Sequence, residues 1–148
     1  MRTPASIAGH PIHPMLVPIP IGLWVFSLVC DIVFTAGSKN PDWTTVALYT
    51  MGGGIVGALL AAVPGLIDLL SLPPAPRKTA IIHMSINLTV VVLYVINLWM
   101  RARGPGDPGA LMWLSLASIG LLAASGWLGG KLVYELGVAV TPAGTPPR

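Results

Sequence analysis

Residues 43–67 read WTTVALYTMGGGIVGALLAAVPGLI and contain no Asp, Glu, Lys or Arg. A helix that crosses the hydrocarbon core of a membrane needs about 20 predominantly apolar residues. The chain has three further charge-free stretches, each at least 22 residues long, at 3–30, 79–100 and 108–130. Backbone groups inside a bilayer must find hydrogen-bond partners within the protein, so each stretch predicts a membrane-spanning helix.

The composition agrees with this interpretation. Only 9% of the 148 residues are charged and 54% are hydrophobic, and the mean hydropathy is +0.79. A soluble domain carries roughly 25% charged residues. The eight Lys and Arg residues are scattered and form no basic patch, which argues against nucleic-acid binding. We therefore expect an integral membrane protein that contacts the lipid bilayer, and not a soluble enzyme or a disulfide scaffold.

The predicted fold is all-α, an integral membrane up-down bundle of four helices with short loops. We expect a single domain without an internal repeat, with helices at about residues 15–36, 43–72, 77–101 and 109–138. The connections are short and rich in Gly and Pro, which places successive helices antiparallel.

Basic residues predict the orientation of the bundle. The side that holds both termini carries Arg2, Arg77, Lys78, Lys131 and Arg148, and the other side carries Lys39, Arg101 and Arg103. Because Lys and Arg are enriched in cytoplasmic loops, this difference predicts that both termini are cytoplasmic.

Glycine and aromatic residues indicate how the helices pack and how they sit in the membrane. Small residues let helix backbones approach closely in a bilayer, so we expect Gly53, Gly57, Gly126 and Gly130 at helix contacts. Most Trp and Tyr residues fall near the predicted helix ends, where they are expected to anchor the protein at the membrane interfaces.

Ionisable residues gather at the end of the bundle that holds the termini. This end collects His10, His13, Asp68, His83, Lys131 and Glu135. Lys131 and Glu135 are four residues apart and are expected to pair with each other. At the opposite end, Asp31 and Asn97 receive no predicted role, and that half is expected to lack the polar residues that a pore needs.

Three histidines are the candidate ligands. His10 and His13 are three residues apart, which places them on one edge of either a helix or a polyproline segment. His83 lies inside the third predicted helix, where an ionisable residue indicates function. Asp68 is expected to orient a histidine ring by accepting its second N–H.

Several blocks of the sequence resemble a known family. The opening GHPIHPMLVPIPIGLW at 9–24, PGLID at 64–68, His83 with Asn87, and GWLGGKLVY at 126–134 are similar to the bacterial membrane-protein family called domain of unknown function 2231. The resemblance implies a four-helix domain in the bacterial inner membrane. It also implies a distant similarity to the membrane domains of b-type cytochromes, and proximity in some members to Rieske-type iron–sulfur proteins.

Three functional hypotheses remain open at this point. The first is electron transfer through one b-type haem, with His83 and either His13 or His10 as axial ligands of the iron and Asp68 nearby. The second is a non-catalytic accessory subunit that packs against other membrane subunits or a redox protein in a respiratory or photosynthetic complex. The third is a divalent-metal site or permeation path. No hydrolytic or nucleotide-binding motif is present, so catalysis is not predicted.

Overall fold

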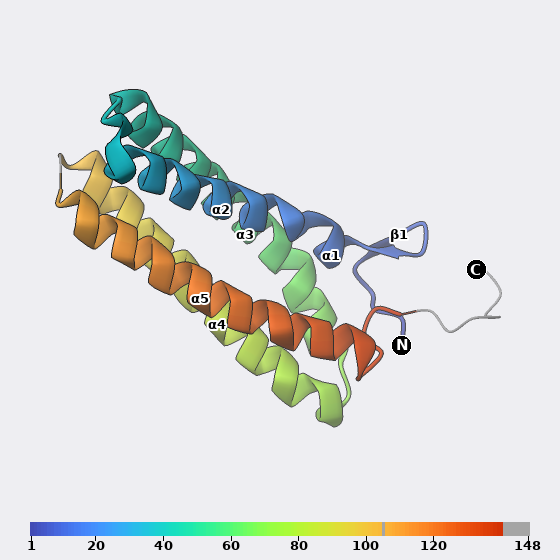
Figure 1. The fold of residues 1–148 in the computed structure, drawn as a ribbon. Coiled ribbons are helices and arrows are strands. Elements are labelled where there is room, and N and C mark those ends of the chain that lie inside the picture. The colour runs from blue at the N-terminus through green and yellow to red at the C-terminus, as the bar shows by residue number, and fades with distance from the viewer. Residues whose placement is uncertain (105, 141–148) are drawn as a thin grey trace.

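Four long apolar helical segments dominate the computed structural model, which describes residues 1–104 and 106–140 (Figure 1). The segments that are long and apolar enough to cross a membrane are Ile12–Ser38, Pro41–Ser71, Pro74–Ala102 and Pro108–Tyr134. They pack against one another with alternating directions. The prediction of an all-α, four-helix membrane bundle is therefore confirmed.

The first segment is interrupted in two places. It consists of α1 (Ile12–Leu16), α2 (Pro18–Val33) and the π-helical turn η1 (Phe34–Ser38). Pro18 lacks the N–H that would continue the helical hydrogen bonds, which explains the break after α1. Helical structure nevertheless begins at Ile12, three residues before the predicted start, so it includes His13.

The other three helices each begin with a proline. They are α3 (Pro41–Ser71), α4 (Pro74–Ala102) and α5 (Pro108–Tyr134). Proline suits the first helical position because its missing N–H would have no partner there. The side chains of Asn40 and Asp107 cap α3 and α5 by accepting hydrogen bonds from Asp42 N and Gly109 N.

The helix α5 ends at Tyr134, four residues before the predicted end. There the Leu136 N–H bonds to the Lys131 carbonyl, and Gly137 adopts a φ of +63°. This left-handed residue lets the chain turn away from the helix. The turn brings the carbonyl of Gly137 within hydrogen-bond reach of the Met1 ammonium group.

A short N-terminal hairpin precedes the bundle. Its strands β1 (Ser6–Ile7) and β2 (His10–Pro11) are antiparallel, and Ala8 and Gly9 between them have φ values of 49° and 80°. Positive φ at both central residues is the geometry of a tight two-residue turn. The hairpin lies at the end of the bundle where the first segment begins (Figure 1).

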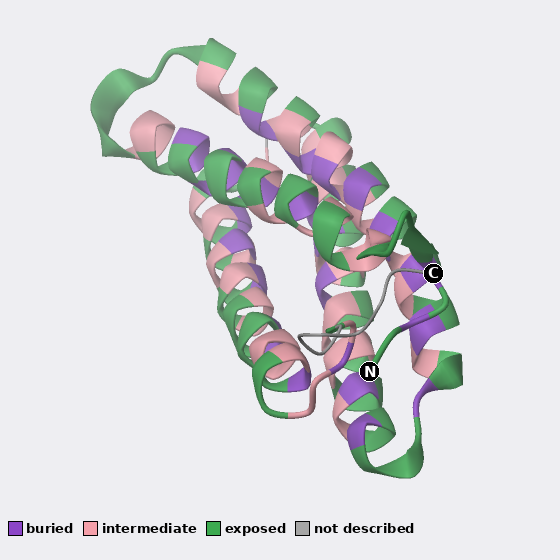
Figure 2. Ribbon diagram, turned by 90° about the vertical axis from the view of Figure 1, so that its right-hand side faces the viewer, coloured by how far each residue is buried: buried purple, intermediate pink, exposed green. Residues whose placement is uncertain are grey.

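The bundle is built from two helical hairpins. The helix pairs α2–α3 and α4–α5 pack extensively, whereas α3–α4 and α2–α5 share fewer contacts. The buried positions form stripes along the helices, and most of the remaining surface is exposed (Figure 2). Because the exposed positions include many large apolar side chains, this outer surface suits contact with lipid tails.

The contacts between the two hairpins recur at a constant spacing in the chain, although no internal repeat was expected from the sequence. Equivalent residues of α1–α2 and α4 lie 70 positions apart, and three such pairs are in direct contact. These contacts join His13 with His83, Trp24 with Tyr94, and Asp31 with Arg101. Contacts of this kind are those expected for two hairpins related by an approximate twofold axis along the bundle.

Hydrogen bonds within the hairpins follow the same repeat. Ser27 and Asn97, again 70 positions apart, donate to the carbonyls of Ala47 and Leu111, which are 64 positions apart on α3 and α5. His13 and His83 contact the carbonyls of Ala61 and Ser125, which have the same separation of 64. The sequences of α3 and α5 need not be similar for these bonds to form, because the partners on both helices are backbone carbonyls.

The middle of the axis is occupied by stacked aromatic rings. Trp24 and Tyr94 are 2% and 0% exposed, and their ring centroids lie 4.3 Å apart with an interplanar angle of 8°. The Trp24 indole N–H donates to the Met51 carbonyl at 3.3 Å. These two residues are core residues and not interfacial anchors. Trp113, Trp127 and Tyr134, by contrast, are exposed as expected.

Of the four glycines predicted at helix contacts, only the two on α3, Gly53 and Gly57, lie there. A Cβ on Gly57 would lie 3.1 Å from Ile19, and one on Gly53 would lie 3.3 Å from Leu23. A Cβ on Gly126 would meet nothing within 4 Å, and one on Gly130 would reach only Tyr134 of the same helix. The prediction is thus wrong for α5, because its packed face carries Ser125 and Gly129 instead.

We expect Gly54→Ala to lower the free energy of unfolding by about 1–3 kcal/mol, the usual cost of overpacking a core. The added methyl group would overlap the Trp24 indole and disturb its stacking on Tyr94. Thermal unfolding in detergent measures the effect. Gly126→Ala is the matched control and should unfold at or above the parental temperature. Equal behaviour of the two variants would contradict the packing described here.

Candidate functional site

The two interior histidines face each other across the axis. His13 comes from α1 and His83 from α4, and both are half-buried. Their ring centroids are 6.3 Å apart and the ring planes are perpendicular. The parallel directions of the first and third spans place both residues at the same end of the bundle.

Each imidazole is fixed by the neighbouring helix of its own hairpin. His13 Nδ1 lies 2.8 Å from the Ala61 carbonyl oxygen, and His83 Nδ1 lies 2.9 Å from the Ser125 carbonyl oxygen. A carbonyl can only accept, so a hydrogen bond to it is donated by the ring Nδ1–H, and the Ser125 hydroxyl oxygen also lies 2.9 Å from His83 Nδ1. The nitrogen that remains for a ligand is Nε2. Metal-binding histidines in proteins commonly have this arrangement, with one N–H held by a carbonyl.

Glycines provide the space that the rings occupy. A Cβ on Gly65 would lie 2.8 Å from His13 Nδ1, and one on Gly129 would lie 3.3 Å from His83 Cε1. Each glycine follows the carbonyl partner of its histidine by four residues, one helical turn later. Both glycines lie in blocks that carry the family resemblance, yet their role depends on a contact that the sequence alone does not reveal.

Asn87 completes the surroundings of His83. Its side-chain amide donates to His83 Nε2 at 3.1 Å, as expected from the four-residue spacing on one helix face. Both nitrogens of His83 thus have partners, whereas only Nδ1 of His13 has a hydrogen-bond partner among the described residues. A ligand on His83 would have to displace the Asn87 amide.

The other two candidate residues are placed differently. His10 is exposed in β2, outside the helical bundle. Asp68 is buried at the histidine end, but its carboxylate accepts from the Ala5 backbone N–H at 2.9 Å. The expectation that Asp68 orients a histidine ring is therefore wrong, because backbone carbonyls hold both interior rings. Asp68 instead holds the N-terminal segment against the bundle.

The opposite end contains a polar cluster that the sequence interpretation missed. The Arg101 guanidinium donates to both carboxylate oxygens of Asp31 at 2.7 Å, and its Nε–H donates to Asn97 Oδ1 at 2.9 Å. Asn97 in turn donates to Ser115 Oγ at 2.9 Å. Ser118, one turn further along α5, is also fully buried. The expectation that this half lacks interior polar residues is wrong.

The sequence contained one signal for this cluster. Asp31 is a carboxylate within the first predicted helix, where burial without a partner would be costly. Arg101 ends a charge-free stretch, which made it resemble an ordinary loop charge. The pair depends on the folded bundle, in which Arg101 of α4 reaches across the interior to Asp31 of α2. By contrast, the predicted pair Lys131–Glu135 is confirmed, with its charged atoms 3.8 Å apart at an exposed position.

The donor set restricts which cofactors fit. Among the described residues, no group of three or more His, Cys, Asp and Glu side chains could hold a metal ion. Zinc usually takes three or four protein ligands. Two imidazoles instead match a metal whose other ligands come from a cofactor, as in haem.

These features define a class, the four-helix integral membrane proteins, here with a histidine pair on an internal axis. The chain belongs to the family described as "Predicted membrane protein (DUF2231)", whose model matches residues 9–142. Neither the curated proteins nor the solved structures include a match to this chain.

Substituting Gly65 tests whether the His13 ring packs against this glycine. We expect Gly65→Ala to move the ring, because the new methyl group would lie too close to Nδ1 for van der Waals contact. NMR of protein with ¹⁵N-labelled histidine should show a changed His13 signal and a nearly unchanged His10 signal. Gly22→Ala, at an exposed position with nothing nearby, is the control. A His13 signal that stays unchanged in Gly65→Ala would refute the contact.

Proposed function

We propose that the protein carries electrons in the membrane by holding one b-type haem between His13 and His83. The observation that supports this proposal is the paired anchoring of the two rings. Both are held through Nδ1 by a backbone carbonyl, both pack on a glycine, and they come from opposite hairpins. An ordinary buried histidine needs a hydrogen-bond partner, but it does not need an equivalent ring facing it.

The separation of the rings suits this role. Imidazole nitrogens bind transition metals at about 2.0–2.1 Å, so two histidines that share one metal would need their rings close together. The observed centroid distance is 6.3 Å.

The chain's own residues would hold the iron and set its reduction potential. Haem supplies one-electron chemistry when it is bound. The carbonyls of Ala61 and Ser125 fix the ring orientations and increase the basicity of the ligating nitrogens. The Asn87 amide would give up its bond to His83 Nε2. Apolar surroundings control the reduction potential by limiting solvent access.

Visible absorption of the purified protein tests this proposal. Protein produced with an ample haem supply should show the spectrum of a six-coordinate b-type haem, with sharp bands on reduction. His13→Ala and His83→Ala should each abolish that spectrum while the protein still inserts into the membrane. His10→Ala is the matched control and should retain it. A colourless parent protein, or a haem that survives both substitutions, would contradict the proposal.

We also propose a location in the bacterial inner membrane with both termini in the cytoplasm. Support comes from the five-to-three distribution of basic residues between the two sides. Partners such as other membrane subunits or a redox protein belong to the same proposal, because an electron carrier needs a donor and an acceptor.

Cysteine labelling measures the orientation. Ser6→Cys and Ser38→Cys, each in a Cys30→Ser background, place a thiol at exposed sites near opposite ends of the bundle. A membrane-impermeant maleimide added to intact cells should label position 38 and not position 6. Labelling with the opposite pattern would reverse the orientation.

A further inference from the structure

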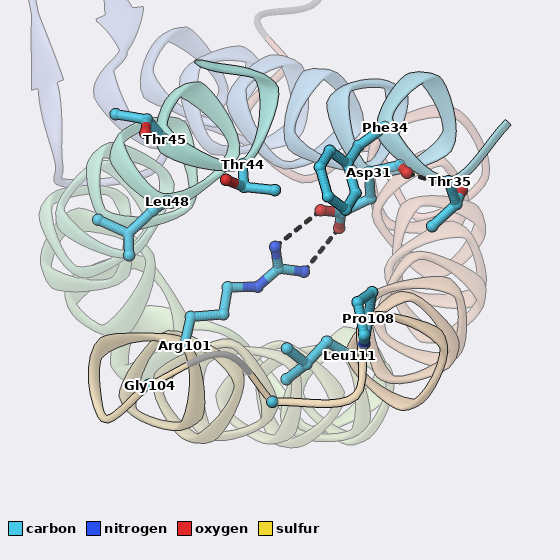
Figure 3. A pocket seen from close by; sticks show the side chains of 11 residues that line it. Asp31, Phe34, Thr35, Thr44, Thr45, Leu48, Arg101, Gly104, Pro108 and Leu111 are labelled. Carbon is cyan, nitrogen blue, oxygen red and sulfur yellow. Dashed lines mark hydrogen bonds and ion pairs between the residues drawn. The ribbon is translucent and has the colours of Figure 1, made fainter. Parts of the chain in front are cut away.

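A cavity of about 300 Å³ lies at the end of the bundle opposite to the histidine pair. It is bounded by the end of α2 with η1, the first turns of α3 and α5, and the end of α4 (Figure 3). Arg101 reaches across it towards Asp31. Arg101 follows His83 by 18 residues on α4, which corresponds to about 27 Å of helix. The cavity is therefore separate from the proposed haem site.

A buried ion pair, Asp31 with Arg101, forms the polar part of the cavity wall. The side chains of Arg101 and Asp31 are 9% and 6% exposed, and two bonds of 2.7 Å join them. With the bond from Nε to Asn97, three of the five guanidinium N–H groups have partners in the described part of the chain. Two N–H groups therefore remain to donate to a ligand.

Stability alone does not explain this pair. Removing two charges from water costs several kcal/mol for each ion, and apolar residues of similar volume are often equally stabilising. A charged residue inside a membrane segment more often marks a functional site. Here the pair borders a cavity that is large enough for a small ligand.

The charge of the site selects a neutral ligand. The Asp31 carboxylate balances the Arg101 guanidinium, so neither an anion nor a cation gains a net attraction. The hydroxyl groups of Thr44 and Thr45 donate to the Pro41 carbonyl, at 2.7 and 3.2 Å, and thus have only acceptor capacity left. The Thr35 hydroxyl likewise donates to the Asp31 carbonyl at 2.8 Å, so Arg101 is the side-chain donor left among the described residues of the wall, and the ligand must offer it an acceptor.

The rest of the wall selects an apolar body. Phe34, Leu48 and Leu111 line the cavity together with Pro108. Its volume is at the lower end of the range of about 300–1,000 Å³ for ligand pockets, which fits a single ring or a lipid head and excludes a macrocycle. The cavity belongs to a membrane-spanning bundle, and the surrounding bilayer supplies lipid-soluble compounds that could occupy it.

We propose that this cavity binds the head of a neutral, lipid-soluble carbonyl compound whose oxygen accepts hydrogen bonds from Arg101. Two membrane components share this chemistry, the ring of a quinone and the ester carbonyls of an uncharged glycerolipid. This assignment rests on the Arg101 site alone and holds whether or not His13 and His83 bind haem.

Binding to purified full-length protein in detergent tests the proposal, with decylubiquinone and dioctanoylglycerol as probes in equilibrium dialysis. We expect one of them to bind saturably at one molecule per chain. The double variant Asp31→Leu/Arg101→Met keeps the site neutral and should weaken binding at least tenfold. Lys131→Met/Glu135→Leu removes an exposed pair at the other end and should leave binding unchanged.

A second variant keeps the test decisive if the double variant does not fold. Leu48→Trp fills the cavity and leaves Asp31 and Arg101 in place, so it should also abolish binding. Saturable binding of decylubiquinone that both changes weaken identifies a quinone, and the same pattern for dioctanoylglycerol alone identifies a lipid carbonyl. No saturable binding of either probe to the parent protein, or binding that Leu48→Trp leaves unchanged, would overturn the proposal.

Discussion

The bidentate ion pair between Asp31 and Arg101 is the constraint that fixes how the two hairpins meet. No water inside a bilayer replaces a missing partner, so each buried charge needs a counter-charge with good geometry. Asp31 comes from the first hairpin and Arg101 from the second, and the pair is 6–9% exposed. Any rotation or sliding of one hairpin against the other would separate these charges. The relative register of α2 and α4 is therefore set at this end.

With that register fixed, the other equivalent residues meet on the same axis. Trp24 stacks on Tyr94 in the middle, and His13 faces His83 at the far end. The distance from Arg101 to His83 along α4 is about 27 Å, close to the roughly 30 Å thickness of a hydrocarbon core. One end thus presents two facing imidazoles. The other end has a cavity at which two Arg101 N–H groups have no partner among the described residues. Two separate polar regions therefore lie at the two ends of the bundle.

Sequence patterns predicted the spans because hydrocarbon demands long charge-free helices, and this demand is visible residue by residue. They also placed His13 and His83 at one end, since helices 1 and 3 of an up-down bundle run parallel. The repeat stayed hidden because its polar pairs differ in type, with Trp opposite Tyr and Asp opposite Arg. The role of Asp68 was missed for a similar reason, because its partner is a backbone N–H of Ala5, which no side-chain pattern reveals.

A double-mutant cycle on Asp31 and Arg101 tests most directly whether this pair sets the arrangement of the hairpins. The free energy of unfolding would be measured by denaturation in mixed micelles for Asp31→Leu, Arg101→Met and the double variant. Each single substitution leaves a buried charge unpaired and should cost about 3–5 kcal/mol, whereas the double variant should lose much less than their sum. Single losses that simply add in the double variant would contradict the account.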